Sequence, residues 1–303
     1  MAGRKKRSFL TQRFGRLKGW QWCAVAVLGA GLVISCALLL SQVMEDVRTA
    51  RIIARNRELA RAGQTQSAGA TPAPEQTAAT PSPTATPAPP TPTPFATVTA
   101  ASAPLTNAGT VDLNALKRLN QDTVGWLTMD SVRTIDFAVV QGNNAYYLAH
   151  DFDGRQNAYG TPFLDEGTPL GADSDNLIVY AHNMRNGEMF GELNRVLEDG
   201  RFLERPYVHF QTLYGSDDYV PYAVCDISVD PQSENYMQYY MPVFSGPGQF
   251  IEYVATAEMS SRVTLPWHAQ YGDKLLTLVT CGAEKNERLL VFLRAVRSTE
   301  RNG

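Results

Sequence analysis

Eight short apolar runs, separated by turn-forming residues, occupy the chain between residues 124 and 296. The runs are rich in Val, Ile, Leu, Phe and Tyr, which are the residue types enriched in β-strands. Strands this short and this frequent favour a barrel or a sandwich over a doubly wound sheet. We therefore expect a mostly β fold of the α+β class, with strands near Val124–Met129, Ile135–Gln141, Thr161–Leu164, Asn176–Asn183, Tyr207–Thr212, Tyr219–Val229, Leu275–Cys281 and Arg288–Val296.

Three segments with helical spacing accompany the strands. Asp112 can cap a short helix that carries Leu113, Leu116 and Leu119 on one face, so the folded part should begin near Val111. The apolar residues of Met189–Leu197 and of Gln249–Met259 also recur at helical intervals. The sequence therefore predicts peripheral helices at these three places.

The N-terminus has the features of a membrane anchor. The first nineteen residues carry seven basic side chains and no acidic one, and the uncharged, mostly apolar stretch 20–44 follows. About 20 apolar residues suffice for a helix to cross a bilayer, and preceding basic residues keep the N-terminus in the cytoplasm. We expect a single-pass anchor with the rest of the chain outside the cell; a cleaved signal peptide is the alternative.

Two further segments separate this anchor from the strands. Residues 45–61 are charged and are expected to form a juxtamembrane helix. Residues 62–110 consist largely of Ala, Thr, Pro, Ser, Gly and Gln and hold ten of the chain's eighteen prolines. Such a composition cannot build a core and predicts a disordered spacer. At about 3.1 Å per residue in a polyproline conformation, some forty of these residues could reach on the order of 130 Å.

Charge and cysteine content limit the possible functions. Of the 27 basic residues seven lie in the N-terminal tail, so the rest of the chain has 20 basic and 30 acidic residues, which argues against nucleic-acid binding. No His/Cys/Asp spacing predicts a metal site, and we expect no cofactor. Only Cys225 and Cys281 lie outside the anchor. Cys225 falls within an apolar run, and we expect it to be a buried free thiol rather than half of a disulfide.

Cys281 is the candidate nucleophile. It ends the run Leu275–Cys281, and Arg288 opens the next run after a short polar loop; His182 ends another apolar run about a hundred residues upstream. A nucleophilic thiol needs a base and a cationic environment, and attack on a carbonyl needs a donor for the oxyanion. His182 and Arg288 could supply these parts, although each of the three residues alone is more often structural.

Neighbouring motifs make the assignment more specific. The segment Thr277–Cys281 followed by Arg288 resembles the signature of sortases, and Tyr180–Phe190 is similar to the histidine region of class B sortases. Further segments that match this class are Asn120–Leu127, Ile135–Gln141, Asn144–Phe152, Gly160–Asp165 and Ser174–Asn176. The resemblance covers about Leu116 to Val296.

The resemblance implies an eight-stranded sortase-type β-barrel in residues 111–303, with the helix Gln249–Met259 as the additional helix of class B. It also implies a cysteine transpeptidase that cleaves a C-terminal sorting motif of secreted proteins, of the Thr-Gly type, through a thioacyl intermediate on Cys281. His182 would transfer protons and Arg288 would hold substrate and oxyanion. The acceptor would be an amine of a peptidoglycan precursor or of a pilin. Residues flanking the site are candidates for substrate binding: Leu148, Tyr180, Asn183, Thr280 and Glu284.

Two alternatives stay open. A pilus-type sortase that polymerises subunits usually carries an N-terminal lid with an Asp-Pro-aromatic motif, whereas the spacer has Thr93-Pro94-Phe95 without the acidic residue. A non-catalytic surface-binding module on a stalk is the other alternative, and the presence of all three reactive residue types argues against it. Arg294 is a weaker candidate than Arg288 for the substrate-binding arginine, because it lies six residues further along the same run.

Overall fold

A computed structural model describes residues 19–67, 111–198, 200–281 and 286–300. These residues belong to two compact units, Met1–Ala50 and Arg51–Gly303. The first unit contains the N-terminal part of helix α1 (Gly19–Ser67). Among the described residues α1 is the one helix long and apolar enough to cross a membrane, and its apolar side chains in this unit are exposed. The basic tail 1–18 lies outside the described residues.

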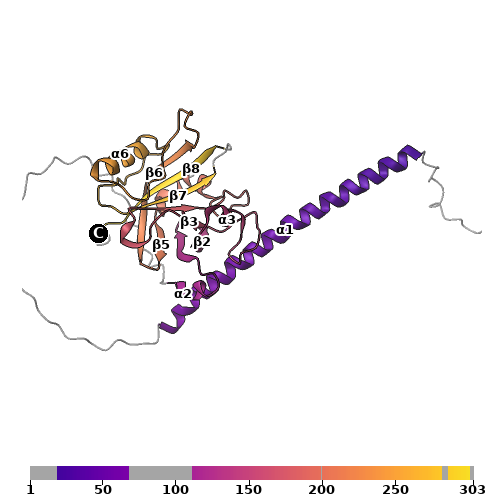
Figure 1. Cartoon of the computed structure of the whole chain (residues 1–303), viewed down its shortest axis with the longest axis horizontal. Coiled ribbons are helices and arrows are strands. Elements are labelled where there is room, and N and C mark those ends of the chain that lie inside the picture. Colours follow the sequence, from indigo (N-terminus) through magenta and orange to yellow (C-terminus); the bar gives the residue numbers. More distant parts are fainter. Residues whose placement is uncertain (1–18, 68–110, 199, 282–285, 301–303) are drawn as a thin grey trace, which may run out of the picture. The chain divides into compact units, whose positions relative to one another are not determined.

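The second unit is built on a closed eight-stranded barrel (Figure 1). The strands follow one another around the barrel in the order β1-β2-β3-β4-β7-β8-β6-β5. Their bounds are β1 Thr123–Met129, β2 Val132–Gln141, β3 Phe163–Leu164, β4 Asn176–Tyr180, β5 Val208–Thr212, β6 Gly215–Ser228, β7 Leu275–Cys281 and β8 Glu287–Ala295. The expected eight-stranded barrel is therefore confirmed, and each expected strand overlaps an observed one.

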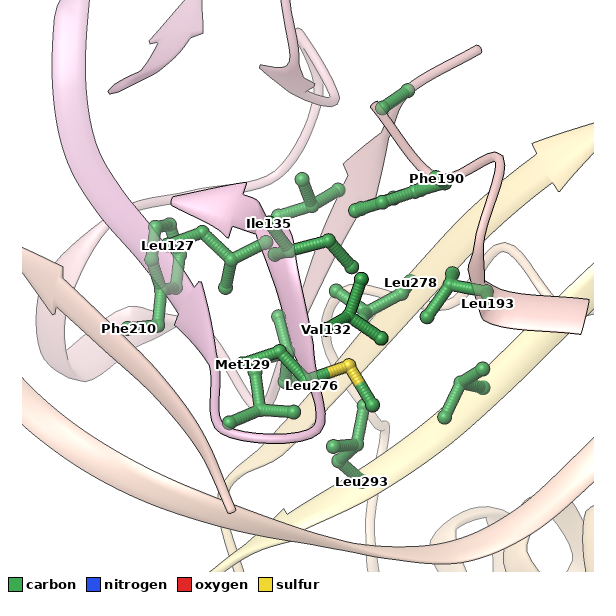
Figure 2. Packing of buried hydrophobic residues seen from close by; sticks show 14 of the residues in the cluster. Leu127, Met129, Val132, Ile135, Phe190, Leu193, Phe210, Leu276, Leu278 and Leu293 are labelled. Carbon is green, nitrogen blue, oxygen red and sulfur yellow. The ribbon is translucent and has the colours of Figure 1, made fainter. Parts of the chain in front are cut away.

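The barrel encloses an apolar core. Alternate side chains of each strand point inward, as Leu127 and Met129 do on β1 and Leu276 and Leu278 do on β7 (Figure 2). Phe190 and Leu193 close one side of this core from the connection after β4. The core therefore fills the barrel, and the functional groups have to lie at its ends or on its outer surface.

Most strand pairs are antiparallel, but two are parallel: β2 with β3 and β4 with β7. The β4–β7 pair has an uninterrupted register from Asn176↔Leu275 to Tyr180↔Val279. Parallel strands end at the same edge of a sheet, so residues that follow β4 and residues at the end of β7 meet there. The β7–β8 pair is antiparallel and also runs without interruption, ending at Cys281↔Arg288.

The helices agree in part with expectation. Helix α2 (Leu113–Lys117) begins after Asp112, whose carboxylate accepts a hydrogen bond from the Ala115 amide at 3.0 Å. Leu113 and Leu116 are buried as expected, whereas Leu119 is half exposed because the helix ends before it. Helix α6 (Pro247–Met259) packs its apolar face on the outside of the barrel and confirms the expected helix (Figure 1).

The expected helix Met189–Leu197 is wrong in its first turn. Helix α4 spans Leu193–Glu198, and Met189 has a φ of 56°, a left-handed conformation that no helical residue adopts. The Phe190 amide donates to the carbonyl of His182 at 3.0 Å, so this segment folds back on the end of β4 instead of starting a helix. Three short elements were not expected: α3 (Asn144–Ala149), α5 (Arg201–Glu204) and a 3₁₀ turn (Gly171–Asp173).

The segment before the barrel also differs from expectation. Helix α1 continues through residues 62–67, where the sequence predicts the start of the spacer. Its residues Ile52, Ile53, Asn56 and Ala60 are buried within the barrel unit. The unit therefore begins at Arg51, well before the expected boundary at Val111. Residues 68–110, the greater part of the expected spacer, lie outside the described residues.

Candidate active site

Cys281, His182 and Arg288 meet at one edge of the barrel. Cys281 pairs directly with Arg288 across β7 and β8. Strand β4 ends at Tyr180, opposite Val279 of β7, and His182 follows two residues later. His182 lines the same cavity as Thr280 and Arg288. Adjacent strands lie about 4.8 Å apart, so the main-chain positions of Cys281 and Arg288 are close neighbours. The side chain of Cys281 lies outside the described part of the molecule.

A hydrogen bond fixes the imidazole of His182. Its Nε2 lies 2.8 Å from the main-chain carbonyl oxygen of Leu148, at the end of α3. A carbonyl only accepts hydrogen bonds, so Nε2 carries the proton in this contact. Helix α3 is in turn capped by Asn143, whose side chain accepts from the Tyr146 amide at 3.0 Å. The orientation of His182 therefore depends on a short helix that the sequence did not predict.

A cavity of about 350 Å³ opens beside these residues. Five of the predicted site residues line it: Leu148, Tyr180, His182, Thr280 and Arg288. Asn183 is exposed and is not one of the lining residues. Glu284 lies outside the described residues. The structure thus brings together most of a residue set that is spread over 140 positions of the sequence.

Aromatic side chains that contact one another form part of the cavity wall. Tyr180 stacks on Phe163 with ring centroids 5.2 Å apart, and its hydroxyl lies 3.3 Å from that of Tyr239. Burial raises the pKa of Tyr180 far above its ordinary value, and the neighbouring Tyr239 raises it further. Tyr180 therefore stays neutral and acts as a hydrogen-bonding, apolar wall.

One hydroxyl at the cavity has no hydrogen-bond partner among the described residues. It belongs to Thr280, which is 3% exposed and directly precedes Cys281. A buried polar atom without a partner costs free energy, on the order of 1–3 kcal/mol, unless another molecule supplies the bond.

Sequence reasoning missed other cavity residues. Asn144, Phe163 and Tyr239 line the same space. Tyr239 comes from the connection between β6 and α6, a tyrosine-rich stretch without regular periodicity, so no local pattern assigned it to the site. Asn144 opens α3, and its amide donates to the Asp165 carboxylate at 2.8 Å, which ties this helix to the end of β3.

Cys225 and Arg294 do not line the cavity and instead make contacts within the folded core. Cys225 is buried, and its thiol lies 3.2 Å from the Ala257 carbonyl oxygen; burial raises its pKa to about 12. The expected free thiol is thus confirmed. Arg294 is 1% exposed and forms a two-pronged ion pair with Glu300, at 2.8 and 2.6 Å. Among the described residues, no cluster of His, Cys, Asp and Glu could hold a metal ion.

Known proteins are similar to this chain in sequence and in fold. The sortase domain family model matches residues 127–296. Sortase B of Listeria monocytogenes is 28% identical over 176 residues, which make up 58% of this chain and 69% of that protein. The X-ray structure of Clostridium perfringens sortase B is 27% identical with a TM-score of 0.55, and the match covers 61% of this chain and 99% of that chain.

A Bacillus anthracis crystal structure described as similar to sortase B gives a comparable match. It is 28% identical with a TM-score of 0.54 and covers 61% of this chain and 82% of that chain. The family match extends from β1 to the end of β8, so it includes His182, Cys281 and Arg288 as well as the cavity. This chain belongs to the sortase family of cysteine transpeptidases, and the relatives named here are sortase B proteins.

Proposed function

We propose that this sortase cleaves a Thr-Gly-type sorting motif near the C-terminus of secreted proteins and transfers them to an amine of peptidoglycan. Cys281 is the nucleophile, His182 the proton carrier and Arg288 the oxyanion partner in this proposal. The observation that supports it most is the meeting of the end of β7, the start of β8 and the segment after β4 beside one cavity, which His182, Thr280 and Arg288 line. A sortase acts on sorting-motif proteins and on amine nucleophiles, which fits this arrangement.

The proposed reaction has two acyl-transfer steps. The Cys281 thiolate attacks the threonine carbonyl carbon, and the resulting oxyanion is held by the guanidinium of Arg288. The C–N bond breaks as His182 gives its proton to the leaving amine, and a thioester remains on Cys281. The acceptor amine then attacks the thioester, gives a proton to His182 and displaces the thiolate. The thioester conserves the acyl activation, so no ATP is required.

The cavity suits a peptide substrate. Leu148 and Tyr180 offer apolar contact, and Thr280 lines the cavity directly before the nucleophile in sequence. We propose that these three residues bind the sorting motif, together with Tyr239, which shares a hydrogen bond with Tyr180. Asn183 and Glu284 stay predictions of substrate contact from their places next to the catalytic residues.

The N-terminal part supports a surface location. We propose that residues 1–19 form a cytoplasmic tail, that residues 20–44 cross the membrane once, and that the barrel lies outside the cell. The exposed apolar side chains of α1 in this region support an environment of lipid. The excess of basic residues before the apolar run supports the orientation. A peptidoglycan precursor would then be a nearby source of the acceptor amine.

A cleavage assay with two cysteine variants tests the catalytic assignment. The substrate is a fluorogenic peptide that carries a Thr-Gly-type sorting motif, assayed with and without a short amine acceptor. We expect Cys281→Ala to abolish both cleavage and transfer, and Cys225→Ala to retain them in the folded fraction, because Cys225 is buried beside α6. Unchanged cleavage by Cys281→Ala would contradict the assignment.

A further inference from the structure

Residues 51–61 of α1 are packed as part of the barrel unit. Their buried side chains follow helical spacing on one face: Ile52, Ile53, Asn56 and Ala60. Ile52 and Ala60 belong to an apolar cluster on the outside of the barrel, with Trp126 of β1 and Ala138 of β2. The intervening residues Ala54 and Glu58 are exposed. This stretch is therefore an amphipathic helix that uses its apolar face to cover β1 and β2.

Three arginines of the same stretch bind acidic and carbonyl groups of the barrel. Arg55 makes two hydrogen bonds to the Asp153 carboxylate, at 2.6 and 3.2 Å. Arg57 donates to the Asp136 main-chain carbonyl at 2.8 Å, and Arg61 donates to the Asp136 carboxylate at 2.7 Å. Most of these contacts are partly exposed and individually weak, but together they fix the direction and register of the helix on the barrel.

The residues that follow the Pro-rich segment 68–110 pack on the same part of the barrel as residues 51–61. The Asp112 amide donates to the carbonyl of Ala60 at 2.9 Å, and Leu113 and Leu116 join the apolar cluster that contains Ile52 and Ala60. Residues 60 and 112 are thus main-chain neighbours, although about fifty residues lie between them along the chain. The chain is therefore anchored on the outer face of β1 and β2 both before the Pro-rich segment, up to Ala60, and after it, from Asp112.

From these contacts we infer that the Pro-, Thr- and Ala-rich segment 68–110 is a loop that leaves and rejoins the catalytic domain, and that residues 51–61 connect this domain to the N-terminal apolar segment. The covalent path from Met44 to Ile52, the first buried apolar residue of α1, then runs through residues 45–51 alone. An extended chain of that length spans at most about 25 Å, whereas a tether of some forty residues would span on the order of 130 Å. The length of the Pro-rich segment therefore does not set how far the active site reaches from the N-terminal segment.

Cleavage of the loop in the full-length protein tests this inference without depending on enzymatic activity or on a membrane. A specific protease site is inserted after Thr84, an affinity tag is placed at the N-terminus, and the detergent-solubilised protein is cut to completion. If residues 51–61 stay docked, we expect most of the C-terminal fragment to remain on the affinity resin after cleavage. In a tether arrangement the C-terminal fragment would elute in full.

Variants on the two faces of the helix make the test specific. Ile52→Asp places a carboxylate in the apolar cluster and should reduce retention by at least about tenfold, since a buried unpaired charge opposes docking. Ala54→Asp, on the exposed face of the same helix, should leave retention unchanged. Arg57→Ala combined with Arg61→Ala is a second variant that leaves the apolar face intact. Its retention should fall, and it should depend less on salt than that of the wild type, because the ion pairs that salt screens are removed.

Circular dichroism before cleavage checks that each variant is folded. The inference would be overturned if the cut wild-type protein releases its C-terminal fragment as completely as Ile52→Asp does. Equal retention of the wild type and of both disrupting variants would also overturn it, because the fragments would then associate through other contacts.

Discussion

The Nε2 atom of His182 lies 2.8 Å from the main-chain carbonyl oxygen of Leu148. This contact links the end of β4 to the end of α3 and determines which ring nitrogen carries the proton, because the carbonyl can only accept. The neutral ring is then the Nε2–H tautomer, with Nδ1 as the acceptor nitrogen. A proton delivered to a leaving amine and taken back later would be exchanged at Nδ1.

The tautomer of His182 can be measured directly. In protein with ¹⁵N-labelled histidine, we expect the neutral His182 ring to show a protonated Nε2 and an unprotonated Nδ1 in a long-range ¹H–¹⁵N spectrum. His182→Asn assigns the signal by removing it, and the ring of His150, whose Nδ1 contacts the Tyr146 carbonyl oxygen at 2.8 Å, should show the opposite tautomer. An Nδ1–H tautomer at His182 would rule out the Leu148 contact in solution.

Arg288 and Arg294 lie on the same strand but should respond differently to mutation. Arg288 lines the cavity, so we expect Arg288→Ala to lower kcat/KM by about 10²–10³-fold, the usual loss for an oxyanion donor. Arg288→Lys keeps the charge and should recover part of that loss. Thermal unfolding should change little in either variant.

Arg294→Met is the matched control. This change removes a buried guanidinium that bonds to Glu300 and to the carbonyl oxygens of His268 and Ala295. We expect it to lower the free energy of unfolding by about 3 kcal/mol, the lower end for a broken buried ion pair, because Glu300 is partly exposed. The folded fraction should keep its kcat/KM. An Arg294 variant with lost activity and unchanged stability would reverse the assignment of the two arginines.

The two carboxylates beside His209 lead us to expect that the free energy of unfolding depends on pH. Burial alone would lower its pKa, but hydrogen bonds to Asp130 at 3.2 Å and Asp218 at 2.7 Å outweigh burial and raise the pKa to about 9. A group whose pKa is raised on folding stabilises the protein fully below its unfolded pKa of about 6.5 and loses this contribution as pH rises through 9. The contribution is on the order of 3 kcal/mol.

Urea unfolding at pH 6, 8 and 10 measures this effect. The free energy of unfolding of the wild type should fall between pH 6 and pH 10 by more than that of Asp218→Asn, which lacks one carboxylate partner of His209. Parallel pH profiles of the two proteins would show that the His209 pair does not have the raised pKa. The activity profile should not follow His209, because this residue lies on β5 and is not one of the residues lining the cavity.

Local sequence pattern was enough for most of the secondary structure. Each apolar run became a strand because β-branched and aromatic residues on a pleated, half-buried surface fit a barrel. The prediction of a helical turn at Met189 was wrong because a contact with a residue outside this segment determines the conformation there. The chain there bonds back to the carbonyl of His182, and the left-handed conformation of Met189 makes that return possible.

The sequence by itself determined the strands, the apolar anchor candidate and the three reactive residue types, because these depend on residue identity and short-range spacing. Only the tertiary structure decided their register: the parallel pairing of β4 with β7 brings the segment that contains His182 to the edge where β7 ends at Cys281, and such pairing joins residues about a hundred positions apart. It likewise decided that residues 51–61 pack on the barrel, since an amphipathic stripe identifies a buried face but not the surface that buries it.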